Sequence, residues 1–152
     1  ADIEATVDTE KMLDAGVPSV QVHTGGECAM DAAMVQQALA QFDTSGLDIL
    51  FMENVGNLVC TAAQDTGAAV NVEILSLPEG DDKPLKYPLM FTVCRCVLIN
   101  KIDTREWFEF DDEAVKSRIH ALNPKAEIFF VSSKTGEGFE QWTDWIRRQK
   151  NA

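Results

Sequence analysis

Two polar turns in the second half of the chain contain residue types that can recognise a purine base. Asn100-Lys101-Ile102-Asp103 follows the apolar run Cys96 to Ile99, and Ser132-Ser133-Lys134 follows the apolar run Ile128 to Val131. Short apolar runs are typical of buried strands, and α/β folds bind ligands just beyond the carboxyl ends of their strands. The two turns are therefore the first candidates for a binding site.

The residues of these turns suit guanine. The carboxylate of Asp103 can accept hydrogen bonds from both the ring N–H and the exocyclic amine of guanine, a pair of donors that adenine lacks. Lys101 can lay its aliphatic stem on the base, and Asn100 can tie neighbouring loops together. The backbone amide of Ser133 can donate to the guanine carbonyl oxygen. The first turn alone could be an ordinary polar loop, but the two turns together favour a guanine site.

A third motif, Glu53-Asn54-Val55-Gly56-Asn57, follows the apolar run Leu47 to Met52. GTPases with a phosphate-binding loop place an acid-x-x-Gly switch in this position. There Glu53 can hold Mg²⁺ through water, and Gly56 lets the backbone approach the γ-phosphate. The alternative is a glutamate at the end of a strand, followed by a plain glycine turn.

The four cysteines form two groups. Cys28 and Cys60 each follow a strand or the switch motif, but they lack the C-x₂-C spacing of zinc fingers, so the residues alone favour buried structural cysteines. Cys94 and Cys96 lie two apart on a predicted strand, share one face, and are expected to pack in the core. The chain is too large and too rich in core residues to need a disulfide scaffold, so we expect reduced thiols.

The composition excludes several kinds of partner. The 152 residues include 25 acidic and 13 basic side chains, for a formal net charge of −12, which repels nucleic acids and anionic membrane surfaces. No apolar run approaches the ~20 residues that span a bilayer, and no export signal opens the sequence. We predict a single domain over residues 1–152, in the cytoplasm.

Short β-branched runs alternate with longer amphipathic segments, which predicts an α/β three-layer sandwich with a mainly parallel sheet. The predicted strands are Val17–His23, Leu47–Glu53, Val70–Leu77, Cys94–Asn100 and Ile128–Ser132. The predicted helices are Asp31–Phe42, Asp111–Leu122 and Gly138–Gln149, and the one long loop is Pro78–Pro88.

Two of these helices carry clear local signals. Asp111 or Asp112 can cap the second helix, and Asn123-Pro124 ends it. In the last helix, an apolar stripe at helical spacing is expected to pack in the core rather than to bind a ligand. The stripe consists of Phe139, Trp142 and Ile146.

Three stretches carry distinctive patterns: residues 20–35, residues 47–60 with LDILFMENVGNLVC, and residues 75–91 with EGDDKPLKYPLMF. They resemble the HypB family of hydrogenase nickel-incorporation GTPases, and the resemblance ends with ALNPKAEIFFVSSKTGEGFEQWTDW at residues 121–145. The resemblance covers nearly the whole chain, and urease-accessory GTPases are more distant relatives. It implies the fold of a SIMIBI-class P-loop NTPase.

The resemblance also implies roles for individual residues. It implies GTP hydrolysis coupled to formation of a homodimer, with nickel or zinc bound between the subunits by Cys28 and Cys60. Thiolates suit both metals. Asp2 would approach Mg²⁺, and Glu53 would lie in the switch. The implied partners are GTP, a hydrogenase precursor and a second nickel chaperone of the HypA type.

Three departures from the family pattern matter. The phosphate-binding G-x-x-x-x-G-K-[ST] loop does not occur in residues 1–152, so the sheet is expected to lack its first strand, that loop and the first helix. Ala29 replaces the usual histidine after Cys28, and Glu27 or His23 could substitute as a metal ligand. Ala1 and Thr61 replace a glycine and a proline, which are minor changes.

These observations lead to two functional hypotheses. The first is a nickel metallochaperone GTPase of [NiFe]-hydrogenase maturation, here as an N-terminally truncated GTPase domain that is a fragment of a longer gene product. Hydrolysis is not expected from residues 1–152 alone, because the phosphate-binding loop supplies the main electrostatic anchor for the nucleotide. The second is a non-catalytic nickel- or zinc-binding or dimerisation module.

Overall fold

The protein divides into two compact units between residues 68 and 69. The computed structural model describes residues 6–150. Asp2, which is expected to approach Mg²⁺, therefore lies outside the described residues. The assignment of one GTPase domain to residues 1–152 stays a prediction.

The second unit is built on three parallel strands, β1 (Val72–Ser76), β2 (Cys96–Asn100) and β3 (Glu127–Phe130). Their order in the sheet is β1-β2-β3, so β2 is central. Ile99 of β2 is paired with Leu75 on one side and Phe130 on the other. The predicted α/β class and parallel sheet are confirmed, and the predicted strands differ from these three only at their ends.

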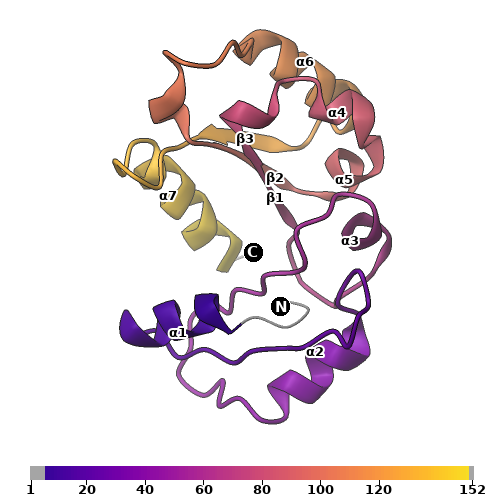
Figure 1. Ribbon diagram of the computed structural model, residues 1–152, viewed down its shortest axis with the longest axis vertical. Coiled ribbons are helices and arrows are strands. Elements are labelled where there is room, and N and C mark those ends of the chain that lie inside the picture. The colour runs from indigo at the N-terminus through magenta and orange to yellow at the C-terminus, as the bar shows by residue number, and fades with distance from the viewer. Residues whose placement is uncertain (1–5, 151–152) are drawn as a thin grey trace. The chain divides into compact units, whose positions relative to one another are not determined.

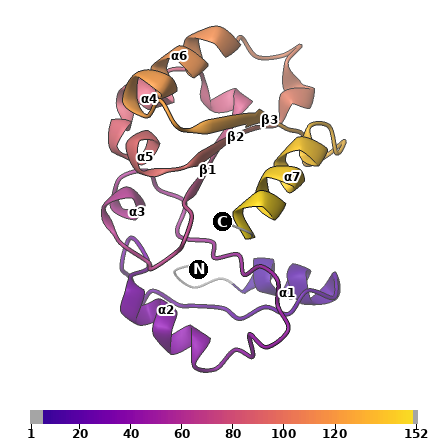
Figure 2. The ribbon, with the colours of Figure 1, turned by 180° about the vertical axis from the view of Figure 1, so that it is seen from behind.

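Helices cover both faces of this sheet. Figures 1 and 2 show α4 (Lys83–Lys86), α5 (Pro88–Val93) and α6 (Asp112–Leu122) on one side, and α7 (Phe139–Lys150) on the other. Two short 3-10 turns, η1 (Leu77–Glu79) and η2 (Ile102–Thr104), follow β1 and β2. The predicted loop at residues 78–88 is wrong, because it contains parts of η1 and the whole of α4. Pro78 and Pro84 stand in the first turns of these elements, where a proline's missing N–H has no helical partner to lose.

The caps of α6 agree with the sequence. The side chain of Asp111 accepts hydrogen bonds from the backbone amides of Glu113 and Ala114, at 3.0 and 2.9 Å. These bonds satisfy two of the amides that have no partner within the first turn of the helix. Asn123 follows Leu122 in an extended conformation and ends the helix.

The core forms on both faces of β2. Cys96 and Leu98 pack with Val131 and Trp145, and the predicted apolar stripe of α7 packs against them. Val97 and Ile99 alternate with these residues along the strand, so they face the opposite side of the sheet, and both are fully buried. The prediction that the aromatic stripe serves packing is therefore confirmed. Cys94 and Cys96 are free thiols in the core, as predicted.

From residue 6 onward, the helices of the first unit are α1 (Val7–Asp14), α2 (Ala32–Leu39) and α3 (Cys60–Ala63). Asp31 caps α2 by accepting a hydrogen bond from the amide of Met34 at 2.9 Å. The predicted helix at residues 31–42 is thus confirmed in a shorter form. Among the described residues, no helix is long and apolar enough to cross a membrane.

Two predicted strands of the first unit are wrong. Residues 17–23 form no strand, although His23 makes a single bridge, and residues 47–53 form no regular structure. A strand needs a neighbour whose backbone groups complete its ladder, and the apolar pattern alone cannot supply one. The apolar side chains of the second segment are accordingly exposed, Leu50 by 48% and Phe51 by 69%.

A substitution at Gly138 tests how closely the turn before α7 approaches the end of β3. Its φ is +76°, and a Cβ at this position would overlap the carbonyl oxygen of Phe130. We expect Gly138→Ala to lower the free energy of unfolding by at least about 2 kcal/mol, measured by chemical denaturation. Gly136→Ala is the matched control, because its φ of +83° is equally unusual but the space around it is open. It should cost only about 1 kcal/mol of backbone strain. Equal losses in the two variants would contradict the close approach.

Glu73 on β1 should make stability depend on pH. Its side chain is buried, and burial, aided by the charge of Glu79 and opposed by that of Lys83, raises its pKa from 4.5 to about 7. The folded chain therefore holds the Glu73 proton more tightly than the unfolded chain does. The stability that this proton contributes is fully present below pH 4.5 and is lost as the pH rises through 7. Glutamine is neutral at every pH, so Glu73→Gln should not lose this stability. The free energy of unfolding of Glu73→Gln minus that of the unmutated chain should therefore rise by about 2–3 kcal/mol from pH 5 to pH 8. The measurement is urea denaturation at both pH values.

Glu140→Gln, at an exposed carboxylate on α7, is the control for that measurement. If Glu73→Gln follows the same pH dependence as Glu140→Gln, the buried carboxylate is not the cause.

Candidate functional site

The two polar turns predicted to bind guanine meet at the carboxyl ends of β2 and β3. The hydroxyl of Ser132 donates a hydrogen bond to Oδ1 of Asp103 at 2.6 Å. The backbone amide and the hydroxyl of Ser133 both lie 3.1 Å from Oδ1 of Asn100 and donate to it. The amide of Ile102 donates to the carbonyl of Val131 at 3.3 Å. Four hydrogen bonds thus join turns that are about thirty positions apart in the sequence.

The backbone at Lys101 directs the first turn toward the second. Lys101 has a φ of 64°, and it is the non-glycine residue with positive φ in the described part of the chain. Its amide donates to Oδ1 of Asn100 at 2.8 Å, and the hydroxyl of Thr104 donates to its carbonyl at 2.7 Å. Left-handed backbone is unfavourable for a residue with a Cβ, so these local bonds offset its cost. The sharp turn brings Asp103 back beside β3.

Ser132 is a supporting residue rather than part of the exposed surface. It is fully buried, and its hydroxyl also accepts a hydrogen bond from the amide of Thr135 at 3.2 Å. Its amide donates to the carbonyl of Glu137, and its carbonyl accepts from the amide of Gly136, at 2.9 and 2.8 Å. The second turn is therefore closed around Ser132. The sequence placed this serine in the motif but did not reveal that it holds the carboxylate of the first turn.

The surface open to a ligand is formed by the remaining motif residues. Lys101, Ser133 and Lys134 are exposed, and Asp103 and Asn100 are partly exposed. An ionised carboxylate offers about four lone-pair positions, so Asp103 can accept the bond from Ser132 and still accept two more donors. The arrangement can therefore bind a ring that presents two adjacent N–H groups.

The segment after β1 places an acidic side chain within electrostatic range of Lys101. Glu79 accepts hydrogen bonds from the amide and the hydroxyl of Ser76, at 2.8 and 2.9 Å. Burial opposes ionisation of Glu79, but the bonds from Ser76 and the charges of Lys83 and Lys101 outweigh it, so the pKa of Glu79 is lowered. The negative charge of Glu79 is thus fixed near the lysine of the first turn.

A neighbouring acid fixes the position of α6. Asp81 accepts a hydrogen bond from the amide of Asp111 at 2.9 Å, and it pairs with the guanidinium of Arg118. The bond from Asp111 lowers the pKa of Asp81 most, burial opposes it, and Arg118 lowers it further. The acidic residues Glu79 and Asp81 therefore connect this segment to the end of β1 and to α6.

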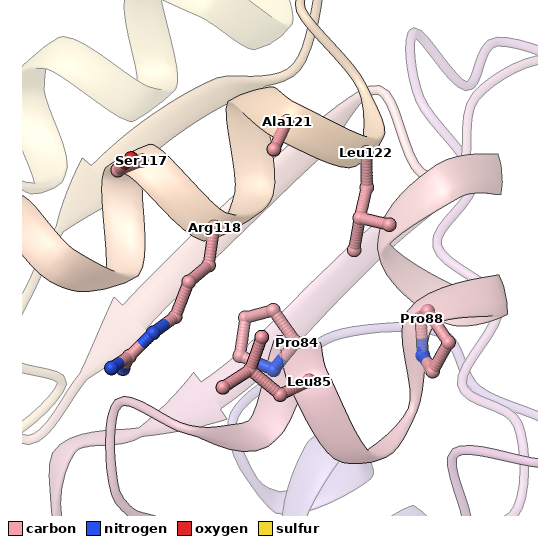
Figure 3. A pocket seen from close by; sticks show the side chains of 7 residues that line it. All are labelled: Pro84, Leu85, Pro88, Ser117, Arg118, Ala121 and Leu122. Carbon is pink, nitrogen blue, oxygen red and sulfur yellow. The ribbon is translucent and has the colours of Figure 1, made fainter.

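An open hollow of about 320 Å³ lies elsewhere in the second unit. It lies beside α6 and is lined mainly by apolar side chains from α4, α5 and α6 (Figure 3). Its lining comprises Pro84, Leu85, Pro88, Ser117, Arg118, Ala121 and Leu122. None of the predicted site residues belongs to it. The candidate site is defined by hydrogen-bonding groups at the strand ends, and not by this hollow.

Cys28 and Cys60 come together in the first unit, where the structure joins them in a disulfide with a Cα–Cα distance of 6.0 Å. The prediction of reduced thiols is therefore wrong for this pair. The prediction of buried cysteines also fails at Cys28, which is exposed, while Cys60 is partly buried. Sequence spacing gave no signal for the pairing, because 32 positions separate the two residues.

The switch motif runs beside this pair. Asn54 accepts a hydrogen bond from the amide of Met30 at 2.8 Å, and Asn57 donates to the carbonyl of Cys28. Glu53 and Gly56, the predicted switch residues, are both exposed in the same segment. The motif and the cysteine loop therefore form one connected surface within the first unit.

A third metal ligand does not join the pair. Among residues 6–150, no group of three or more His, Cys, Asp or Glu side chains could hold a metal ion. The suggested replacement of the missing histidine by Glu27 or His23 is thus not found, and both side chains are exposed. The pair on its own offers two sulfur ligands.

Proteins of one nucleotide-binding family are similar to this chain. The nucleotide-binding domain of the CobW/HypB/UreG family matches residues 1–130. The chain belongs to this family. The hydrogenase maturation factors HypB of Azotobacter vinelandii and Escherichia coli K12 are 46% and 40% identical to it, over 98% and 99% of this chain. The chain spans about half the length of these relatives, 49% and 52%.

A solved structure also resembles this chain closely. The crystal structure of HypB from Helicobacter pylori in complex with nickel has a TM-score of 0.93 and 38% sequence identity. The match covers 98% of this chain and 71% of that one. The predicted P-loop NTPase-like fold is therefore confirmed, as is the resemblance to HypB on which it depended.

The two groups of cysteines should differ in reactivity. Burial raises the pKa of both Cys94 and Cys96 to about 12, with smaller contributions from Glu73 for the first thiol and from Cys94 and Glu127 for the second. At pH 8 only about one in ten thousand of these groups is then the reactive thiolate. We expect a maleimide to modify neither residue in the folded chain.

The readout is mass spectrometry of peptides before and after mild reduction. Reduction should open Cys28 and Cys60 to the reagent while Cys94 and Cys96 stay unmodified until the chain is unfolded. Rapid labelling of either buried thiol in the folded chain would contradict this.

Proposed function

We propose that this chain contributes the guanine-recognising part of the GTP site of a hydrogenase maturation factor that handles nickel. The observation that carries the proposal is the hydrogen bond from Ser132 to Asp103, which fixes a carboxylate beside the second turn. Membership of a family defined by a nucleotide-binding domain supports it. So do the relatives named as hydrogenase maturation factors.

Each turn has its own task in this proposal. Asp103 accepts the ring N–H and the amine of guanine, while Lys101 covers one face of the ring with its aliphatic stem. The amide of Ser133 already donates to Asn100, so contact with the guanine carbonyl requires that bond to be shared or exchanged. Lys134 adds a positive charge at the rim. A bound base would cover the Asp103 carboxylate. Adenine would then leave that carboxylate without two hydrogen-bond donors, and an unsatisfied acceptor that is shielded from water costs free energy.

GTP hydrolysis is proposed for the complete gene product. Glu53 would hold Mg²⁺ through water, Gly56 would let the backbone approach the γ-phosphate, and Asp2 would approach the same ion. The exposure of Glu53 and Gly56 is compatible with these roles. Binding of the phosphates themselves depends on a G-x-x-x-x-G-K-[ST] loop, a motif that residues 1–152 do not contain.

The cargo would be nickel, or zinc, bound by Cys28 and Cys60 after reduction of their disulfide. Two thiolates are suitable soft ligands for either metal, and the Cα–Cα distance of 6.0 Å lets both sulfurs reach one ion. The remaining ligand positions would be filled by water or by a second copy of the chain in a homodimer. The nickel complex of the Helicobacter pylori relative supports nickel as the metal. A hydrogenase precursor and a HypA-type chaperone would be the partners.

A non-catalytic metal-binding or dimerisation module is the second candidate. The Cys28–Cys60 pair favours it, because the two sulfur ligands come from residues other than those of the two polar turns. Phosphate release from GTP and Mg²⁺ by the complete gene product separates the two functions. A product that binds nickel after reduction but has no affinity for any nucleotide would be the module.

Asp103→Asn tests the guanine assignment. The amide offers one acceptor in place of a carboxylate, so the preference for GDP over ADP should fall by roughly 1–3 kcal/mol, or about 5- to 150-fold. The measurement is competition between the two nucleotides in the complete gene product. Asp144→Asn, which removes an exposed carboxylate paired with Arg147 on α7, is the control and should keep the preference. An unchanged preference in Asp103→Asn would sink the assignment.

A further inference from the structure

One side chain in the first unit bonds to both cysteine-bearing loops. The amide nitrogen of Asn57 donates to the carbonyl of Cys28. Its side-chain oxygen accepts from the backbone amides of Cys60 and Val59, at 2.8 and 3.2 Å. A single planar amide therefore bridges the backbones of two residues that are 32 positions apart in the sequence.

The two ends of this bridge have different consequences. The bonds from Cys60 and Val59 satisfy amides at the start of α3, which is a local helix-capping contact. The bond to the carbonyl of Cys28 is a long-range contact that fixes the distance between the two loops. Cys28 is exposed and lies outside any helix or strand, so no backbone ladder holds it in place.

Asn54 provides a contrast within the same segment. Its side-chain oxygen accepts from the amide of Met30 at 2.8 Å and from its neighbour Val55 at 2.8 Å, and its nitrogen donates to the carbonyl of Met30 at 3.4 Å. Asn54 thus holds the residues after the cysteine loop. Within the described part of the chain, the side chain of Asn54 bonds to Met30 and Val55 and not to either cysteine, whereas Asn57 bonds to the backbone of both.

We infer that Asn57 is the positioning residue that presents the Cys28 and Cys60 sulfurs to each other and to a single thiophilic divalent cation. The inference rests on the proposed metal role of Cys28 and Cys60, and it names the residue that holds their two loops together. Two thiols held at a fixed separation have a high effective concentration, which favours both the disulfide and a shared cation. Loss of the bond to Cys28 lets that loop move away and lowers both tendencies.

Two equilibria report on the cysteine pair: reduction of its disulfide by dithiothreitol, and binding of Ni²⁺ to the reduced chain. Reduced dithiothreitol donates two electrons and two protons to the Cys28–Cys60 disulfide, which becomes two thiols, while dithiothreitol becomes its cyclic disulfide. In the reduced chain, Ni²⁺ replaces the two thiol protons, which pass to the buffer. The first equilibrium involves no metal, and the second involves no change of oxidation state.

Three variants of the full chain separate the two ends of the bridge. Asn57→Ala removes all of its side-chain bonds. Asn57→Asp keeps an acceptor for the amides of Val59 and Cys60 but has no donor for the carbonyl of Cys28. Asn54→Ala is the matched control, because it removes an asparagine from the same segment without touching the cysteine residues. Circular dichroism checks that each variant is folded.

We expect the equilibrium constant for disulfide formation against dithiothreitol to fall about tenfold in both Asn57 variants and to stay within about twofold in Asn54→Ala. The affinity of the reduced chain for Ni²⁺, measured by titration, should fall about tenfold in the same two variants. If Asn57→Ala does not fold, Asn57→Asp alone decides the result.

Two outcomes would overturn the inference. In the first, Asn57→Asp behaves like the unmutated chain, which would limit Asn57 to capping α3. In the second, Asn54→Ala changes both equilibria as much as the Asn57 variants, which would make the whole segment responsible. If the unmutated reduced chain takes up no Ni²⁺, the proposed metal role fails, but the dithiothreitol equilibrium still decides the role of Asn57.

Discussion

The hydrogen bond from the Ser132 hydroxyl to the Asp103 carboxylate is the constraint on which the candidate nucleotide site depends. It is possible because β2 and β3 are adjacent parallel strands, so that their carboxyl ends emerge at one edge of the sheet. Ser132 is fully buried, and a buried hydroxyl that lost this partner would carry a desolvation cost. The packing of the second unit and the direction of one carboxylate are therefore linked through a single contact.

The first unit is organised by a different kind of interaction. It contains no strand among its described residues, and its loops are held by side-chain amides and carboxylates that bond to backbone groups. Asp31 starts α2, Asn54 holds Met30, and Asn57 joins the two cysteine loops. Such contacts are individually weak, but each replaces a backbone partner that a sheet would otherwise supply. The segment of residues 53–57 and the Cys28–Cys60 disulfide are consequently held by the same few hydrogen bonds.

The sequence predicted the second unit well because its signals are local. The motif at residues 100–103 lies at a strand end, Asp111 caps α6, and the apolar stripe of α7 packs in the core, all as expected. Predictions failed where the outcome depends on distant partners. Residues 17–23 and 47–53 have strand-like patterns, but a strand exists only when its neighbour is present. The pairing of Cys28 with Cys60 has no periodicity to reveal it, because 32 positions separate the two residues.

In the proposed metal role, the burial of Cys94 and Cys96 would limit where a cation can bind. Cysteine thiolates are strong ligands for soft cations, and four cysteines would ordinarily create competing binding sites. Two of them are buried and disfavour the charged form, so only Cys28 and Cys60, once their disulfide is reduced, would offer thiolates to a metal. Each chain would then carry one ion at a defined place, and no second pair of cysteines would retain that ion during its transfer.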